Sequence, residues 1–215
     1  MDLLDTIRST GAVRGFTDAP VSDATVADVL EAARFAPSGG NRQPWRVAVV
    51  KDAALRQTIA GLMRPVWQEY CGANAVGKRP FVMGRSIDAP PVAVPNALID
   101  EIASVPVVLA IAANLQEIAI MDGNLERPPV VGGASIYPFC WSILLAARAH
   151  GLGGVLTTFL SRAEPAAAPA LGLPADHALV ATIFLGVPTH QNTKLRRNPV
   201  NSFATVDRFD GDSFG

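Results

Sequence analysis

A stretch of twenty residues without a charged side chain, Pro128–Ala147, constrains the fold of this chain more than any other segment. Its length matches the roughly 20 apolar residues that a membrane-spanning helix needs. Its first half, however, contains residues that break helices: Pro128, Pro129, Gly132, Gly133 and Pro138. Only about ten to fifteen residues keep a helical pattern, which suits a buried helix in a globular core. We therefore expect a central buried helix over Ala134–Ala149.

Four further helices are predicted from apolar spacing and from residues that begin or end helices. The first follows Asp2 and stops at Gly11, and the second runs from Ser22 to the break at Pro37. The boundaries of the other two are equally explicit: Asp52 caps a helix that reaches about Met63, and Ser161 and Glu164 have the spacing of a capping box for a helix that reaches Leu171.

Short runs rich in β-branched and apolar residues predict four strands. These are Trp45–Val50, Pro106–Ala113, Val155–Phe159 and Ala178–Val187. The strands and helices do not alternate regularly, and no strand leads into a Gly-x-Gly-x-x-Gly loop. The pattern therefore indicates an α+β fold and disfavours a Rossmann dinucleotide site.

The organisation of the chain is predicted to be a single domain over residues 1–215, because folded domains usually contain about 50 to 250 residues. Residues 64–104 contain five prolines and are expected to form an irregular, partly helical excursion. Its aromatic residues Trp67, Tyr70 and Phe81 are candidates for a substrate lid. The polar tail, residues 188–215, is expected to wrap over another surface.

Composition excludes several classes of function. A net charge of −1 provides no general positive field for nucleic acid. The scattered cysteines and histidines fit neither a redox pair nor a metal site: Cys71, Cys140, His150, His177 and His190. The N-terminus lacks the pattern of a secretory signal, so we expect a cytoplasmic protein that does not bind membranes.

The segment most informative about chemistry runs from Ala36 to Trp45 and reads Ala-Pro-Ser-Gly-Gly-Asn-Arg-Gln-Pro-Trp, between a predicted helix and a predicted strand. Its small residues let a ligand approach the backbone, and Ser38 and Asn41 can both donate and accept hydrogen bonds. Two prolines, Pro37 and Pro44, stiffen the loop. An ordinary helix-to-strand loop is the alternative interpretation of a shorter string of this kind.

The full string closely resembles the loop of FMN-dependent nitroreductases, commonly Ala-Pro-Ser-x-x-Asn-x-Gln-Pro-Trp. The resemblance covers nearly the whole chain, including Val13–Phe16, Gly133–Ser135 and the basic pair Arg196 and Arg197. It implies a three-layer fold, with a central mixed or antiparallel sheet flanked by helices. It also implies an intertwined homodimer in which the C-terminal extension wraps the partner and FMN lies between the subunits.

The resemblance also implies roles for particular residues. Arg14 would reach the flavin ring, and Arg196 or Arg197 would contact the FMN phosphate. The strand-end residues Thr157 and Thr158 would lie near flavin N5. The loop residues that would contact the flavin held mainly by the other subunit are Pro37, Ser38, Gly39, Asn41 and Gln43.

The chain departs from the family motif at Thr10, Gly11 and Ala12, where Arg, Arg and Ser are common. Two cations and a hydroxyl are therefore missing near the expected phosphate. Arg8 is the nearest basic candidate to replace them, with a solvated surface arginine as the alternative. Losing one charge-assisted contact costs about 1.5–3 kcal/mol.

The implied reaction is a ping-pong transfer of two electrons from NAD(P)H, through FMN, to a nitroaromatic, a quinone or a similar acceptor. The flavin carries the chemistry, so no catalytic triad is expected. Three alternatives stay open at this point. They are a flavin-binding protein without turnover, a dehalogenating or flavin-modifying relative of the same fold, and a deazaflavin in place of FMN.

A second aromatic group lies on the predicted central helix, at Tyr137, Phe139 and Trp141. These side chains could face a flavin. Their helical spacing on an apolar segment favours packing in the core or in a dimer interface.

Overall fold

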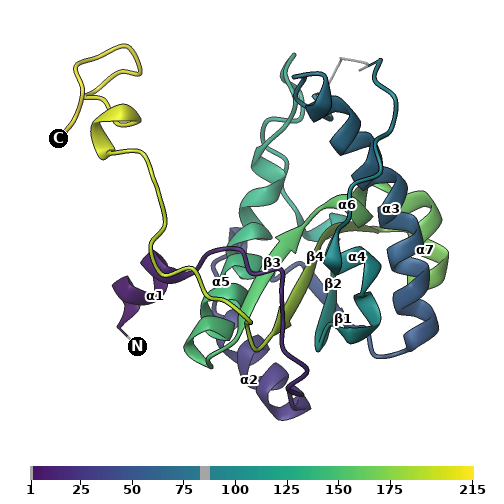
Figure 1. Ribbon diagram of the computed structural model, residues 1–215. Helices are drawn as coiled ribbons and strands as arrows, with labels where there is room; N and C mark the ends of the chain where they lie inside the picture. The colour runs from purple at the N-terminus through teal and green to yellow at the C-terminus, as the bar shows by residue number, and fades with distance from the viewer. Residues whose placement is uncertain (1, 83–87) are drawn as a thin grey trace.

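The protein is described here by a computed structural model that covers residues 2–82 and 88–215. It has an α+β fold built on a four-stranded sheet with the order β1-β2-β4-β3, in which every neighbouring pair is antiparallel (Figure 1). The strands are β1 (Trp45–Val49), β2 (Val107–Asn114), β3 (Gly153–Thr157) and β4 (His177–Gly186).

Helices cover both faces of this sheet. They are α1 (Leu3–Ser9), α2 (Asp23–Ala33), α3 (Ala53–Ala75), α4 (Ala97–Asp100), α5 (Tyr137–Ala149), α6 (Phe159–Arg162) and α7 (Glu164–Leu171). Short 3-10 helices lie at Gly39–Asn41, Ile102–Ser104, Leu115–Glu117, Val131–Ser135 and Val200–Ser202. The result is the expected arrangement of a sheet flanked by helices.

The core lies on both sides of the sheet because β2 is central and its two faces are both covered. Leu109 and Ile111 pack with α2 and α5, whereas Val108 and Ala110 pack with α3, α4, α6 and α7. A strand buried on both faces carries a continuous apolar run instead of an alternating one. This explains why the sequence predicted β2 so clearly.

The predicted start signals of two helices are confirmed. The Ser22 side chain accepts a hydrogen bond from the Thr25 amide at 3.1 Å, and the Asp52 side chain accepts one from the Leu55 amide at 2.7 Å. Asp2 occupies the N-cap position of α1, but its side chain makes no capping hydrogen bond. Helix α5 begins at Tyr137, because residues 131–135 form a 3-10 helix before it.

The predicted end of the third helix was wrong. Helix α3 passes Met63 and continues to Ala75, so the first part of the 64–104 excursion is helical. Pro65 lies on the exposed face of the helix, while Met63 and Val66 continue its buried face. Burial of this face therefore outweighs the hydrogen bond that an internal proline removes. Within the rest of the excursion, residues 83–87 lie outside the described residues.

The predicted capping box at Ser161 and Glu164 was also wrong. Ser161 lies inside α6, and the strand before it, β3, covers Gly153–Thr157 instead of Val155–Phe159. Glu164 instead accepts a hydrogen bond from the Leu179 amide at 2.5 Å. The β2–β4 register shifts at this point, where Ala112 pairs with Leu179 and Ile111 with Ala181. The carboxylate thus satisfies a backbone donor at a strand irregularity.

None of the helices in the described part of the chain has the length and apolar character needed to cross a membrane. The uncharged stretch Pro128–Ala147 contributes Phe139, Cys140 and Ile143 to the core that includes α2 and α5.

Arg56 joins α3 to the two sheet segments beside it. Its guanidinium donates to the Val50 carbonyl at 3.0 Å and to the Val105 carbonyl at 2.7 Å. These carbonyls lie just after β1 and just before β2. One side chain therefore fixes the exit of one strand against the entry of the next.

We predict that Arg56→Met lowers the free energy of unfolding by about 1–3 kcal/mol, because it leaves these carbonyls without a charged donor. Urea unfolding followed by circular dichroism measures the change. Gln57→Met, on the exposed side of the same helix, is the matched control and should stay near wild type. Equal stability of both variants would show that the Arg56 contacts contribute nothing.

Candidate functional site

Two adjoining cavities lie beside β3. The cap-side cavity, of about 590 Å³, is lined by Arg14, Trp67, Tyr70, Pro95, Asn96, Ala97, Leu98, Leu156, Thr157, Thr158 and Phe159. The α1-side cavity, of about 400 Å³, is lined by Thr10, Gly11, Ala12, Arg14, Tyr137, Trp141, Leu144, Gly154, Val155, Leu156 and Arg197. Arg14 and Leu156 line both cavities, so the two form one continuous candidate site.

Arg14 is held in place by the backbone on its N-terminal side. The Val13 amide donates to the Gly154 carbonyl at 2.9 Å, and Ala12 forms a parallel bridge with Gly154. Val13 is buried against Gly153, where an added Cβ would lie 2.8 Å from the valine side chain. Only glycine permits this close approach. The contact fixes the segment on the edge of β3 and presents Arg14 to both cavities.

Thr157 and Thr158 are placed at the C-terminal end of β3, where the cap-side cavity opens. The Thr157 hydroxyl is buried and has no hydrogen-bond partner among the described residues. Buried hydroxyls are usually hydrogen-bonded, so this group is available to a ligand or an ordered water. The structure therefore brings both predicted threonines together with Arg14.

Aromatic side chains form the outer wall of the cap-side cavity. Trp67 stacks on Tyr70 with ring centroids 5.7 Å apart, and Phe159 meets both rings edge-on at 5.6 and 5.9 Å. The Trp67 indole donates to the Val94 carbonyl at 2.7 Å, which fixes the plane of its ring. Phe81 lies next to Tyr70, at 6.4 Å between centroids. Trp67, Tyr70 and Phe159 thus give this cavity an aromatic wall.

Arg197, a basic residue of the C-terminal tail, lines the α1-side cavity. The tail returns to the end of α1, where Gln191 donates to the Ser9 carbonyl at 3.0 Å. Leu195 lies so close to Gly11 that an added Cβ there would be 2.8 Å from it. This contact brings Arg197 to the cavity, whereas Arg196 lines neither cavity.

Thr10, Gly11 and Ala12, which replace the common Arg, Arg and Ser, form an uncharged part of the wall of the α1-side cavity. The Thr10 hydroxyl donates to the Thr6 carbonyl at 2.6 Å, so it is used inside the helix. Arg8 is exposed on α1 and lines neither cavity. Arg14 and Arg197 are therefore the cations that the described residues offer to a ligand in the α1-side cavity.

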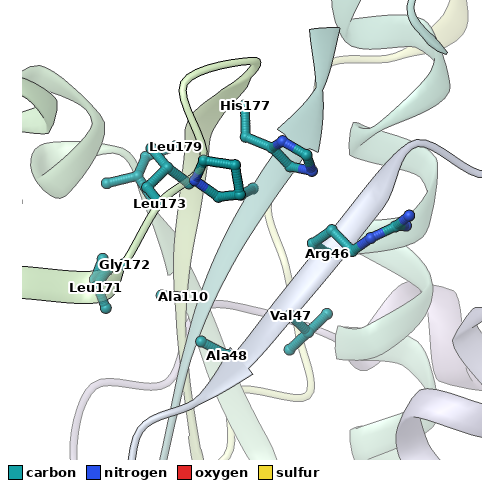
Figure 2. A pocket seen from close by; sticks show the side chains of 11 residues that line it. Arg46, Val47, Ala48, Ala110, Leu171, Gly172, Leu173, His177 and Leu179 are labelled. Atoms are coloured by element: carbon teal, nitrogen blue, oxygen red, sulfur yellow. The ribbon is translucent and has the colours of Figure 1, made fainter. Parts of the chain in front are cut away.

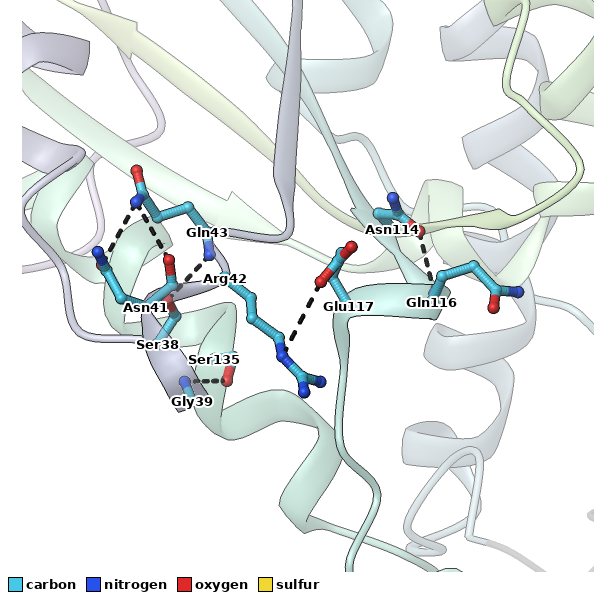
Figure 3. Close-up of polar contacts among 9 residues, drawn as sticks. All are labelled: Ser38, Gly39, Asn41, Arg42, Gln43, Asn114, Gln116, Glu117 and Ser135. Carbon is cyan, nitrogen blue, oxygen red and sulfur yellow. Dashed lines mark hydrogen bonds and ion pairs between the residues drawn. The ribbon is translucent and has the colours of Figure 1, made fainter.

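The residues of the Ala36–Trp45 loop form a separate, internally hydrogen-bonded unit (Figure 3). The Ser38 hydroxyl accepts from the Gln43 amide at 3.0 Å, and the Ser135 hydroxyl accepts from the Gly39 amide at 3.0 Å. The Gln43 side chain donates to the Asn41 carbonyl at 3.2 Å. Asn41 and Gln43 have positive φ angles of 55° and 50°.

None of the five predicted loop residues lines either cavity beside Arg14: Pro37, Ser38, Gly39, Asn41 and Gln43. The loop lies instead against the 3-10 helix Val131–Ser135. The predicted site residues of one chain thus form two separate groups, one around Arg14 and one around Ser38.

The aromatic group on α5 divides between two roles. Phe139 stacks on Trp45 in the core, with centroids 4.6 Å apart and planes 2° apart. Tyr137 and Trp141 lie on another side of the helix, are partly exposed and line the α1-side cavity. Burial raises the pKa of the Tyr137 hydroxyl above its ordinary value. Sequence reasoning assigned all three to packing, although their i, i+4 spacing separates Tyr137 and Trp141 from Phe139.

Comparisons with known proteins identify the family. The family model described as "Nitroreductase family" matches residues 7–187. The chain is 30% identical to the nitrobenzene nitroreductase of Ectopseudomonas oleovorans over 205 residues, covering 85% of each chain. It is 29% identical to the NADH dehydrogenase of Thermus thermophilus, covering 88% of each. The chain therefore belongs to the nitroreductase family and is an oxidoreductase of that family.

The fold agrees with this assignment. The structure superposes with a TM-score of 0.71 on a Desulfovibrio desulfuricans protein described as a nitroreductase in complex with FMN. The two are 23% identical, and the match covers 97% of this chain and 98% of the other. At this identity the likeness shows the nitroreductase fold.

We predict that Ser135→Ala accelerates hydrogen exchange at the Gly39 amide by about tenfold, because that amide loses its acceptor. Ser38→Ala should do the same at the Gln43 amide and leave Gly39 unchanged. Exchange followed by NMR resolves the two sites, and each variant serves as the control for the other. Unchanged exchange at both amides would contradict the hydrogen bonds seen in this loop.

Proposed function

We propose that this protein is an FMN-dependent NAD(P)H oxidoreductase that passes two electrons to a nitroaromatic, a quinone or a similar electron-poor acceptor by a ping-pong cycle. The observation that carries the proposal is the position of Arg14, shared by two cavities. One of these ends at Arg197 and the other at Thr157 and Thr158. The D. desulfuricans neighbour was crystallised with FMN, and the T. thermophilus relative is named an NADH dehydrogenase.

The residues present fit FMN. A flavin nucleotide has an anionic phosphate, a polar ribityl chain and a flat ring with a negative N1–O2 edge in the reduced state. The α1-side cavity offers Arg197 for the phosphate, and Arg14 lies between the cavities for the N1–O2 edge. The cap-side cavity offers apolar walls for the ring and the buried Thr157 hydroxyl, which has no partner among the described residues.

The protein's part in the reaction is to position and to stabilise charge. FMN, when bound, supplies the hydride-accepting and hydride-donating chemistry. Arg14 would stabilise negative charge at the N1–O2 edge, because a fixed cation there needs no reorganisation during reaction. Thr157, Thr158 and their amides would orient the N5 edge. The ring wall of Trp67 and Tyr70 would exclude water and hold a planar acceptor.

A homodimer is part of the proposal. Large apolar side chains are exposed along α1 and the tail, including Leu3 at 66%, Phe203 at 72% and Phe214 at 60% exposed. The end of the tail stands away from the sheet and its helices, beyond α1 (Figure 1). Large exposed apolar side chains gathered on two such segments are typical of a protein interface. A two-fold dimer would also bring the Ser38 loop of one subunit to the Arg14 site of the other.

The decisive test of the proposed function is anaerobic addition of NADPH, and separately of NADH, to the purified protein loaded with FMN. We predict rapid bleaching of the flavin absorbance and its return on adding p-benzoquinone. Colour that persists with both nicotinamides would identify a flavin-binding protein without turnover. Extraction and mass measurement of the copurified cofactor distinguish FMN from a deazaflavin.

We predict that Arg14→Gln and Arg197→Gln each raise the dissociation constant for FMN roughly 10- to 100-fold, because each removes a charge-assisted contact. Arg8→Gln removes the same charge from a side chain that lines neither cavity, so it should match wild type. Flavin fluorescence titration measures all three. Wild-type affinity in the first two variants would remove these arginines from the site.

We predict that the native mass is that of two chains and that Leu4→Glu shifts it toward one chain, because a charge would be buried in the interface. Val76→Glu, at the end of α3 and of similar exposure, is the matched control. Sedimentation equilibrium measures both. A wild-type protein with the mass of one chain would contradict the dimer.

A further inference from the structure

A third cavity, of about 330 Å³, lies at the opposite edge of the sheet from Arg14, over β1 and β2 (Figure 2). It shares no lining residue with the two cavities of the proposed flavin site. Its volume falls in the range of small-molecule sites, which begins at about 300 Å³. We call it the β1-edge cavity.

The floor of the β1-edge cavity is hollow because small side chains pair across two strands. Ala48 of β1 lies opposite Ala110 of β2, and Arg46 lies opposite Ala112. Directly opposed residues point to the same face of a sheet. Three alanines therefore occupy positions where larger side chains would fill the space.

One wall comes from the turn that follows α7. Gly172 ends this helix in the left-handed region, with φ of 61°, and the Leu173 amide then donates to the Ala168 carbonyl at 2.9 Å. This turn brings Leu171, Leu173 and Pro174 over the alanine floor. The wall is apolar and is fixed by helix-end hydrogen bonding.

His177 supplies an oriented polar group to this apolar space. Its side chain is only 10% exposed, and its Nδ1 lies 2.7 Å from the Asp176 carboxylate. The same contact lowers the pKa of Asp176, so the carboxylate is ionised at neutral pH and accepts from Nδ1–H. Nε2 has no hydrogen-bond partner among the residues that the structure describes. The dyad therefore fixes the ring and leaves one nitrogen for a ligand.

Arg46 is the second polar group that lines the cavity. Its guanidinium donates to the Trp45 carbonyl at 2.9 Å and pairs with no carboxylate in the described part of the chain. Figure 2 shows His177 and Arg46 on one side of the cavity and Leu173 and Leu179 on the other. The cavity thus has a polar side and an apolar side.

We propose that the β1-edge cavity binds a small phenol, with its ring on the alanine floor and its hydroxyl on His177 Nε2. A hydroxyl suits this nitrogen because it donates to a neutral imidazole and accepts from a protonated one. The aromatic ring suits the apolar floor and wall, and the single hydroxyl suits the one ring nitrogen that the dyad leaves open. This site is independent of the flavin site and of the reaction proposed for it.

The test uses the FMN-loaded protein, with 4-fluorophenol as the probe and 4-fluoroanisole as its partner that lacks the hydroxyl donor. Titration is followed by fluorine NMR. We expect saturable binding of the phenol and about tenfold weaker binding of the ether, since one buried hydrogen bond is lost. In His177→Phe the two probes should bind equally.

Two further variants locate the binding. Ala48→Leu fills the floor and should abolish the bound signal, whereas Val49→Leu, on the other face of the same strand, should retain it. Flavin absorbance, the thermal midpoint and the native mass show whether each variant remains folded. Absence of saturable binding to wild type, equal affinity of wild type for both probes, or persistence of the signal in Ala48→Leu would each overturn the proposal. If the tail of a second copy occupied the cavity, the wild-type protein would show no saturable binding.

Discussion

The close approach of the segment at Val13 to the glycines of β3 is the contact on which the candidate site depends. Hydrogen bonding of the Val13 amide to Gly154, and packing of its side chain on Gly153, hold a non-helical segment against the sheet edge. A β-carbon at residue 153 would push this segment outward and move Arg14 with it. The position of Arg14 between the two cavities therefore depends on the absence of a β-carbon at Gly153 in β3.

Much of the fold could be predicted because local signals and burial agree. Ser22 and Asp52 cap helices as expected, and the unbroken apolar run of β2 corresponds to a strand covered on both faces. The errors occur where a distant contact prevails over a local signal. Pro65 stays inside α3 because its neighbours are buried, and Glu164 serves the Leu179 amide on another strand instead of its own helix.

The site was predicted in the same uneven way. Arg14, Thr157, Thr158 and Arg197 come together around adjoining cavities, although they are far apart in sequence. That grouping followed from resemblance, since periodicity alone cannot place a tail residue beside residue 14. Tyr137 and Trp141 were assigned to packing because apolar spacing does not distinguish a helix face against the core from one against a cavity. The β1-edge cavity arises from cross-strand pairing of alanines, which a linear sequence does not display.

Because Arg14 lines both cavities, its charge affects which ligands bind before the cofactor and which bind after it. Before a cofactor arrives, the guanidinium leaves both cavities with a positive potential that attracts anions of many kinds. In the proposed flavin complex, the negative charge of the cofactor would offset that potential, and the remaining space would present the aromatic side chains of Trp67 and Tyr70. Binding of the cofactor would thereby change the preference of the Arg14 site from anionic to uncharged ligands without any movement of the backbone.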